Sequence, residues 1–382
     1  MRSHTLFPFA VMTLAVFSTP AISQSQQSSD APAATLKMQV REVILPVTVR
    51  DKHGALVTTL KASDFTLTED GRPQTIKSFT RESNLPFRLG LLVDTSRSLS
   101  GAMDAERKAA DKFVDLMLPA PPAQSKDQAF LIHFDREVEL LEDFTNSREK
   151  LHREIGDMGP SKAAQNDSQG PETTGENRSR GGRGGTQLYD AIFLAADELM
   201  KSKDGHKALV VFSDGQDRGS KDTLNDAIDA ADRASLAVYT VYFKGEVERS
   251  NNGFPGNNRR GGMGGGGYPG GGGGYPGGGG YPGGGGGGRG GSKESGVDGK
   301  KIMEQIATRT GGHAYEAKKK ENLEEIYNQI SEELRGQYLL TYTPDKVDND
   351  GGFHKIALKA DKTDFSIATR EGYFAPGGDA SK

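Results

Sequence analysis

Two short apolar runs, far apart along the chain, each stop at an aspartate. Leu89–Val93 leads into Asp94, and Leu209–Phe212 leads into Ser213 and Asp214. Continuous apolar runs of this length are typical of strands in a parallel sheet that helices cover on both faces. The carboxyl ends of such strands meet at one edge of the sheet, where ligands bind. We therefore expect Asp94 and Asp214 to lie together at that edge.

Hydroxyl side chains accompany these two aspartates. Ser96 and Ser98 follow Asp94 at two-residue spacing, and alternate residues of an extended turn face the same way. Thr186 follows a glycine and opens a helical pattern downstream. Each piece alone is also typical of a helix N-cap or a turn, but the three together form an oxygen-only ligand set. Such a set suits Mg²⁺, or alternatively Mn²⁺ or Ca²⁺, so we predict a metal site formed by Asp94, Ser96, Ser98, Thr186 and Asp214.

The segment 85–335 alternates between strands and helices, as a doubly wound, mostly parallel α/β sheet requires. The apolar runs 129–134 and 138–144 are joined too tightly for a crossover helix, so we expect them to pair antiparallel. Thr186 is predicted to cap its helix, which carries Leu188, Ile192, Ala195 and Leu199 at helical spacing. Further strands are predicted at 87–93, 209–213, 237–243 and 313–316, and helices at 99–118, 148–155, 224–234, 300–309 and 323–334.

Both ends of the chain carry strand-like segments. Residues 37–84 hold too few of them for an independent sandwich, and residues 337–376 supply more. We therefore expect the α/β domain to be inserted into a small β-sandwich that both ends build together. Asp348–Gly352 lies between the predicted strands 338–342 and 354–358; because it lacks the later acidic ligands of a calcium loop, it is interpreted as a hairpin turn.

Two low-complexity segments, 159–184 and 246–293, interrupt this order. The first is rich in Gly, Ser, Asn and Arg; the second is mostly glycine, with Tyr-Pro pairs at Tyr268, Tyr275 and Tyr281. Neither buries enough apolar area to offset its ordering entropy, so both are predicted to be disordered inserts. Both are expected to leave the sheet at the predicted metal edge. The tyrosines there are either contacts for a partner or a glycan around the metal, or part of a tolerated flexible insertion.

The amino terminus predicts export. Residues 1–23 combine Arg2, an apolar stretch and a small-x-small cleavage site, which is typical of a signal peptide, and 24–36 reads as a linker. The sequence contains no cysteine, whereas a eukaryotic secreted protein of this kind usually carries disulfides. We expect a bacterial periplasmic, cell-surface or secreted protein without a membrane span. The net charge of −4 favours neither nucleic acid nor an anionic surface as a partner.

Common enzymatic motifs are missing from the sequence. The seven histidines show no His-x-x-x-His spacing, and there is no phosphate-binding loop, nucleophile elbow or thiol. His133 alternates with apolar neighbours and is interpreted as an ordinary strand residue. A metal-assisted hydrolase would need a general base beside the ion, and the sequence offers none. We predict that the protein is not an enzyme; an envelope scaffold whose ion only rigidifies the fold remains the alternative to a binding module.

Roughly residues 86–335 of the chain resemble the von Willebrand factor A domain. Asp94, Ser96 and Ser98 match the Asp-x-Ser-x-Ser part of its metal-ion-dependent adhesion site (MIDAS), and Thr186 and Asp214 match the later ligands. The resemblance implies that hydroxyls coordinate the ion, that the aspartates act directly or through water, and that a partner carboxylate completes the shell. Among such proteins, the chain looks most similar to an exported acidobacterial group.

The function that this resemblance implies is metal-dependent protein binding. We expect an exported adhesion-type module that recognises a carboxylate on a protein partner. Arg97 lies between two of the expected ligands, at a position where the family often has glycine. It is expected to leave the ion in place but to alter what approaches it.

Overall fold

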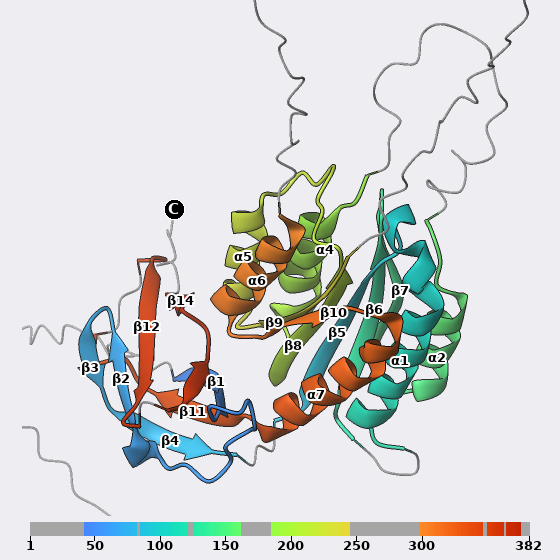
Figure 1. The fold of residues 1–382 in the computed structure, drawn as a ribbon. Helices are drawn as coiled ribbons and strands as arrows, with labels where there is room; N and C mark the ends of the chain where they lie inside the picture. Colours follow the sequence, from blue (N-terminus) through green and yellow to red (C-terminus); the bar gives the residue numbers. More distant parts are fainter. Residues whose placement is uncertain are drawn as a thin grey trace, which may run out of the picture. The chain divides into compact units, whose positions relative to one another are not determined.

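A six-stranded sheet forms the centre of the larger part of the fold, with the strand order β10-β9-β8-β5-β6-β7 (Figure 1). Neighbouring strands are parallel except β6 and β7, which pair antiparallel as the short connection predicted. The fold class predicted for this segment is confirmed. The strands are β5 (Phe87–Asp94), β6 (Gln128–Phe134), β7 (Val138–Thr145), β8 (His206–Ser213), β9 (Ala237–Phe243) and β10 (Ala314–Ala317).

Helices cover both faces of this sheet, and they begin and end close to the predicted bounds. The first predicted helix starts as a 3-10 turn, η2 (Arg97–Ala102), before α-helical geometry sets in. The helix near Thr186 ends in a π-helical turn, η3 (Ala195–Met200). The α-helices are α1 (Met103–Met117), α2 (Arg148–Asp157), α4 (Leu188–Leu194), α5 (Leu224–Arg233), α6 (Gly299–Thr310) and α7 (Leu323–Gly336).

This computed structural model describes part of the chain: residues 42–81, 85–120, 125–161, 185–244, 298–346, 350–362 and 364–375. The predicted signal peptide (1–23) and linker (24–36), most of the insert 159–184 and all of the insert 246–293 lie outside these ranges. The described residues all belong to one compact unit. Within the described residues, no helix combines the length and apolarity needed to cross a bilayer.

Alternating side chains of the central strands feed two hydrophobic cores. Leu89, Leu91 and Val93 of β5 pack with α1, α2 and α7 on one face of the sheet. Leu92 belongs to the core on the other face, which α4, α5 and α6 cover (Figure 1). Because helices cover both faces of the sheet, successive residues of β5 are buried on opposite faces, and almost all of them are apolar. Its first polar core residue is Asp94, at the edge.

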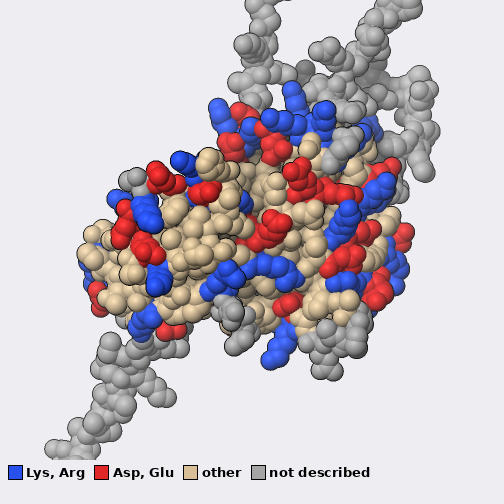
Figure 2. Space-filling view, turned by 60° about the horizontal axis from the view of Figure 1, so that its bottom comes forward, with Lys and Arg blue, Asp and Glu red and all other residues tan. Residues whose placement is uncertain are grey.

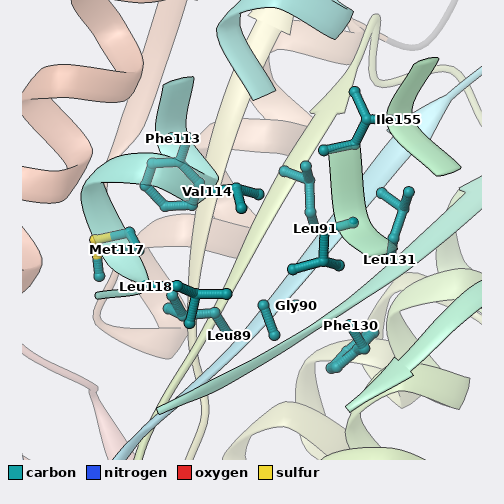
Figure 3. Close-up of a pocket in the computed structure, with 12 residues that line it drawn as sticks. Leu89, Gly90, Leu91, Phe113, Val114, Met117, Leu118, Phe130, Leu131 and Ile155 are labelled. Atoms are coloured by element: carbon teal, nitrogen blue, oxygen red, sulfur yellow. The ribbon is translucent and has the colours of Figure 1, made fainter. Parts of the chain in front are cut away.

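Gly90 lies in a closely packed part of β5. A Cβ atom built on it would lie 2.3 Å from Leu209 Cδ2 and 2.3 Å from Phe130 Cζ, so a side chain does not fit. Apolar side chains from β5, β6, α1 and α2 surround this point (Figure 3). The cavity among them has a volume of about 10 Å³ and an entirely apolar lining, so it is a packing defect and not a ligand site.

Two four-stranded antiparallel sheets are built from both ends of the described chain. Their strand orders are β13-β1-β11-β4 and β14-β12-β2-β3, and side chains from both sheets share one core. Each sheet therefore joins early strands to strands that follow α7, as a split sandwich requires. The strands are β1 (Val43–Arg50), β2 (Phe65–Glu69), β3 (Arg72–Gln74), β4 (Ile76–Thr80), β11 (Tyr338–Tyr342), β12 (Phe353–Ala360), β13 (Ser366–Ala368) and β14 (Gly372–Phe374), with 3-10 turns η1 (Ala62–Asp64) and η4 (Lys320–Asn322) elsewhere.

Several sequence predictions for this part were wrong. β11 and β12 do not form a hairpin, because β11 pairs with β1 and β4, whereas β12 pairs with β2 and β14. The Asp348–Gly352 segment therefore connects two sheets, and its residues 348–349 lie outside the described ranges. Pro46 lies within β1 without ending the strand. Strand β14 was not predicted.

A buried polar network joins β1 to α7. Glu333 is fully buried and forms an ion pair with Arg50. Thr48 Oγ1 donates to Glu333 Oε1 at 3.2 Å, and Tyr315 OH donates to Oε2 at 3.0 Å. A buried carboxylate is tolerated only when its oxygens are paired in this way.

On the surface, basic and acidic side chains are interspersed over the face that Figure 2 presents.

Candidate metal centre

The pairing of β5 with β8 places the two sequence-predicted aspartates at one edge of the sheet. Val93 lies opposite Phe212 in this parallel pair, so Asp94 and Ser213 come next in register. Ser213 Oγ donates to Asp94 Oδ2 at 2.7 Å. Asp214 follows Ser213 immediately, and its negative charge contributes to raising the pKa of Asp94.

The loop after β5 brings two hydroxyls to the same edge. Ser96 N donates to Asp94 Oδ1 at 2.9 Å, which fixes the carboxylate against the start of η2. Ser96 Oγ and Ser98 Oγ lie 3.1 Å apart, within hydrogen-bond distance. Both serines are half-buried, whereas Arg97 between them is exposed. The Asp-x-Ser-x-Ser sequence thus becomes a compact cluster of oxygen atoms.

Thr186 also reaches this edge, but not in the way that the sequence predicted. Its N–H donates to Arg218 O at 3.2 Å and its C=O accepts from Arg218 N at 2.8 Å, so it forms a bridge with the loop after β8. The next residue, Gln187, is the N-cap of α4 and donates its N–H to Asp135 O at 2.8 Å. The prediction that Thr186 caps the helix was wrong, because its backbone is extended and paired with Arg218.

Burial governs the electrostatics of the cluster. Asp94 is fully buried and Asp214 is 9% exposed. Burial raises the pKa of Asp94 to about 7; hydrogen bonds from Ser96 and Ser213 oppose the rise, and the nearby charge of Asp214 adds to it. Within the described residues, hydroxyl and amide groups are the recorded partners of these carboxylates.

This donor set fits a hard divalent cation. Two buried carboxylates concentrate negative charge where neutral hydroxyls cannot compensate for it. Mg²⁺ prefers such oxygen ligands and keeps several waters, so few protein donors suffice. A bound cation would favour the charged form of Asp94 and so oppose the effect of burial on its pKa. We find no feature of the described site that conflicts with an ion there.

Two glycines allow α6 to begin directly against the loop that carries Asp214. Gly215 has φ of +69°, in the left-handed region that favours glycine. A Cβ atom on Gly299, the first residue of α6, would lie 2.1 Å from Asp214 O. One on Gly215 would lie 2.2 Å from Gly299 O. The glycine of the Ser-Asp-Gly turn is therefore required for this close packing.

Two residues near the edge were missed as parts of the site. Ser213 was expected only as turn context, yet it is a hydrogen-bond partner of Asp94. Asp135 directly follows the apolar strand β6, much as Asp94 closes β5, so the same sequence signal identifies it. Its carboxylate is used differently: Oδ2 accepts from Ser161 N at 2.8 Å, and Oδ1 accepts from the amide of Arg136. Asp135 therefore holds the neighbouring backbone.

His133 is held away from a catalytic role, in agreement with its interpretation as a strand residue. Its Nδ1 lies 2.8 Å from Gly159 O and 3.3 Å from Thr95 Oγ1, and its Nε2 lies 3.2 Å from a Glu139 oxygen. These contacts occupy both ring nitrogens. No histidine contact to Ser96, Ser98 or either aspartate is recorded among the described residues.

The comparison with protein families agrees with this geometry. Residues 89–216 match the family model of the von Willebrand factor type A domain. Over this segment the chain is similar to the von Willebrand factor type A domain. The matched segment includes all five predicted ligands of the A domain, from Asp94 to Asp214. No curated protein matches the chain at the sequence level.

Several solved structures resemble the A domain at low sequence identity. Proximal thread matrix protein 1 from the mussel byssus is 12% identical with a TM-score of 0.40, over 66% of this chain and 48% of that one. This chain therefore spans about half the length of that protein, which has also been solved with zinc in its MIDAS motif. BatB from Bacteroides thetaiotaomicron is 14% identical (TM-score 0.38, 64% of this chain, 98% of that one). The vWF domain of the type V pili tip protein Mfa5 from Porphyromonas gingivalis is 12% identical (TM-score 0.40, 66% and 95%).

Proposed function

We propose that this protein is an exported binding module whose A domain holds a divalent cation and uses it to recognise a carboxylate on a partner protein. The proposed ligands are Asp94, Ser96, Ser98, Thr186 and Asp214. The observation that carries the proposal is the cluster at the β5–β8 edge, where buried Asp94 is bonded to Ser96 and Ser213 beside Asp214. Mg²⁺ is the expected ion, with Mn²⁺ and Ca²⁺ as alternatives.

The chemistry of recognition follows from the charge of the donors. Because Ser96, Ser98 and Thr186 are neutral, the cation keeps net positive charge after the protein ligands are in place, and it attracts a hard anion such as a carboxylate. The chain's own residues hold the edge rigid: Ser213 and the Ser96 amide orient Asp94, and Gly215 lets α6 close against Asp214.

The first test measures metal binding by titration calorimetry with Mg²⁺ and Mn²⁺. We expect the Ser98→Ala variant to bind at least about tenfold more weakly, because it loses an oxygen ligand. Ser100→Ala is the matched control: Ser100 is an exposed serine on the same 3-10 turn, and its hydroxyl donates to Arg97 O at 2.9 Å. Equal affinity of the wild type and Ser98→Ala would contradict the proposed ligand set.

The same titration at different pH values tests Asp94 directly. A proton on this carboxyl competes with the cation, and burial raises its pKa to about 7. Below that pH the apparent affinity is expected to fall by up to about tenfold per pH unit, and above it to level off. An affinity that does not change between about pH 5.5 and about pH 8 would remove Asp94 from the ligand set.

The second test asks whether the ion has an open position for a carboxylate. With Mn²⁺ bound, water-proton relaxation reports the water molecules on the ion. Acetate is expected to displace water and lower the relaxation enhancement, whereas acetamide at the same concentration is not. Relaxation that is insensitive to acetate, together with stabilisation by the metal, would instead indicate the structural scaffold. If the protein is a binding module, a partner that it retains from an envelope extract should be lost when a chelator is added.

A further inference from the structure

A second cluster of ligand-type side chains lies in the antiparallel sheets, outside the A domain's site. Glu69 ends β2, Asp70 follows in the turn, and His354 lies in the neighbouring strand β12. Ile356 pairs with Glu69 in antiparallel register, so His354 lies beside the turn. Ligand atoms of Glu69, Asp70 and His354 all lie within 4.8 Å of one another.

The contacts within this cluster leave one buried oxygen without a hydrogen-bond partner. Glu69 is 1% exposed; its Oε2 accepts from Tyr342 OH at 2.6 Å and from Tyr373 OH at 3.4 Å. Its Oε1 accepts no hydrogen bond from the described residues and lies 3.9 Å from His354 Nδ1. A buried carboxylate oxygen without a partner is destabilising, because it has lost its hydration without a replacement. The tyrosines thus orient Glu69 and aim its free oxygen at the histidine.

The histidine faces a second carboxylate at closer range. His354 is 6% exposed, and its Nδ1 lies 2.8 Å from Asp70 Oδ2. Asp70 is fixed in turn: its Oδ1 accepts from Lys355 N at 2.9 Å, and its backbone has a φ of +49°. Two ligands about 2.1 Å from one tetrahedral ion would lie about 3.4 Å apart. That spacing falls between the 2.8 Å of the Asp70–His354 pair and the 3.9 Å of the Glu69–His354 pair.

We propose that Glu69, Asp70 and His354 form a second divalent metal site, which takes a transition ion such as Zn²⁺ or Co²⁺. An imidazole nitrogen with two carboxylate oxygens is a ligand set that these ions prefer to Mg²⁺. Tyr342 supplies the outer-shell hydrogen bond to Glu69, and Asp350 Oδ1 lies 3.7 Å from the other ring nitrogen, His354 Nε2. Water fills the remaining positions, and the ion clamps the β2 turn to β12.

The alternative occupant of the cluster is a proton. A protonated His354 between Asp70 and Glu69 would form a buried ion-pair triad and would bind no ion. The metal site predicts that an added transition ion binds here, whereas the protonated triad predicts that it does not. Neither arrangement depends on the proposed function of the A domain. The experiment below keeps the two sites apart by saturating the oxygen-only site with Mg²⁺.

The test titrates the full chain with Co²⁺ in millimolar Mg²⁺ and follows the visible absorption of the bound ion. We expect one Co²⁺ site that Zn²⁺ displaces. Asp70→Asn and His354→Gln should each weaken Co²⁺ binding at least about tenfold. His53→Gln is the control, because His53 is an exposed histidine in the turn after β1. None of these variants should change Mg²⁺ binding at the A domain.

The outcomes decide between metal and proton. Absence of a Co²⁺ signal in the wild-type chain would overturn the proposal, as would equal affinity of the wild type and Asp70→Asn. The Asp70 variant carries this decision if His354→Gln does not fold, because the Asp70 side chain is 36% exposed and tolerates an isosteric change. Loss of Co²⁺ binding in the Asp70 variant, with an unchanged unfolding transition in chelator, supports the site.

Discussion

Glu106 gives the sharpest prediction that does not depend on any ligand. It lies in α1 and is fully buried against α7, where Tyr327 OH donates to its Oε1. Its Oε2 has no hydrogen-bond partner among the described residues. Burial raises the pKa of Glu106 from 4.5 to about 8, and the tyrosine hydrogen bond opposes the rise. Glu106 is therefore expected to be a neutral acid at physiological pH.

The pKa difference fixes the sign and size of the effect on stability. Below about pH 4.5 the carboxyl is protonated in both the folded and the unfolded state, so its titration costs nothing. As the pH rises toward 8, the unfolded chain releases the proton and the folded chain keeps it, so the free energy of unfolding falls. At 1.36 kcal/mol per pKa unit, the loss between about pH 5 and about pH 9 is about 4 kcal/mol. Relaxation around the charge makes this an upper value.

The assay compares urea unfolding of the wild type and Glu106→Gln at both pH values, with chelator present. The glutamine keeps the shape and cannot ionise, so the variant should gain up to about 4 kcal/mol on the wild type from about pH 5 to about pH 9. Glu325→Gln on the exposed side of α7 is the control. If the difference between Glu106→Gln and the wild type changes by less than about 1 kcal/mol, Glu106 is not a buried neutral acid and the reasoning fails.

Three further substitutions test the packing. Gly90→Ala places a Cβ atom 2.3 Å from neighbouring side chains, so urea unfolding should show a loss of about 1–3 kcal/mol with unchanged Mg²⁺ affinity. Gly299→Ala pushes on Asp214 O from 2.1 Å, so calorimetry should show Mg²⁺ binding weakened several-fold; unchanged affinity would mean that α6 does not support the site. Arg50→Met strands the buried Glu333 charge and should cost about 3–5 kcal/mol in urea unfolding. Adding Glu333→Leu to Arg50→Met should recover most of that loss of stability. If it does not, the loss comes from the packing of Arg50 and not from the unpaired charge of Glu333.

Local patterns in the sequence predicted the elements of the A domain well. The apolar run before Asp94, the tight connection between β6 and β7, and the spacing of α5 and α7 each depend on neighbours within a few residues. Hydrophobic periodicity reports such neighbours directly, which is why these bounds are nearly right. The same signal could not tell Asp135 from Asp94. Both lie where an apolar strand stops, but backbone amides occupy both oxygens of Asp135, whereas Asp94 accepts from one backbone amide and from the Ser213 hydroxyl.

The sequence by itself determined which strands end in an aspartate and where serines follow. Only the tertiary structure decided which of these groups meet, because strand order and register are set by the packing of whole faces. Ser213 reaches Asp94 across 119 residues through the β5–β8 pairing. His354 reaches Asp70 across 284 residues, because β11 and β12 divide between two sheets instead of forming a hairpin. Side-chain chemistry is local to the sequence, whereas the distance between two side chains is a property of the folded core.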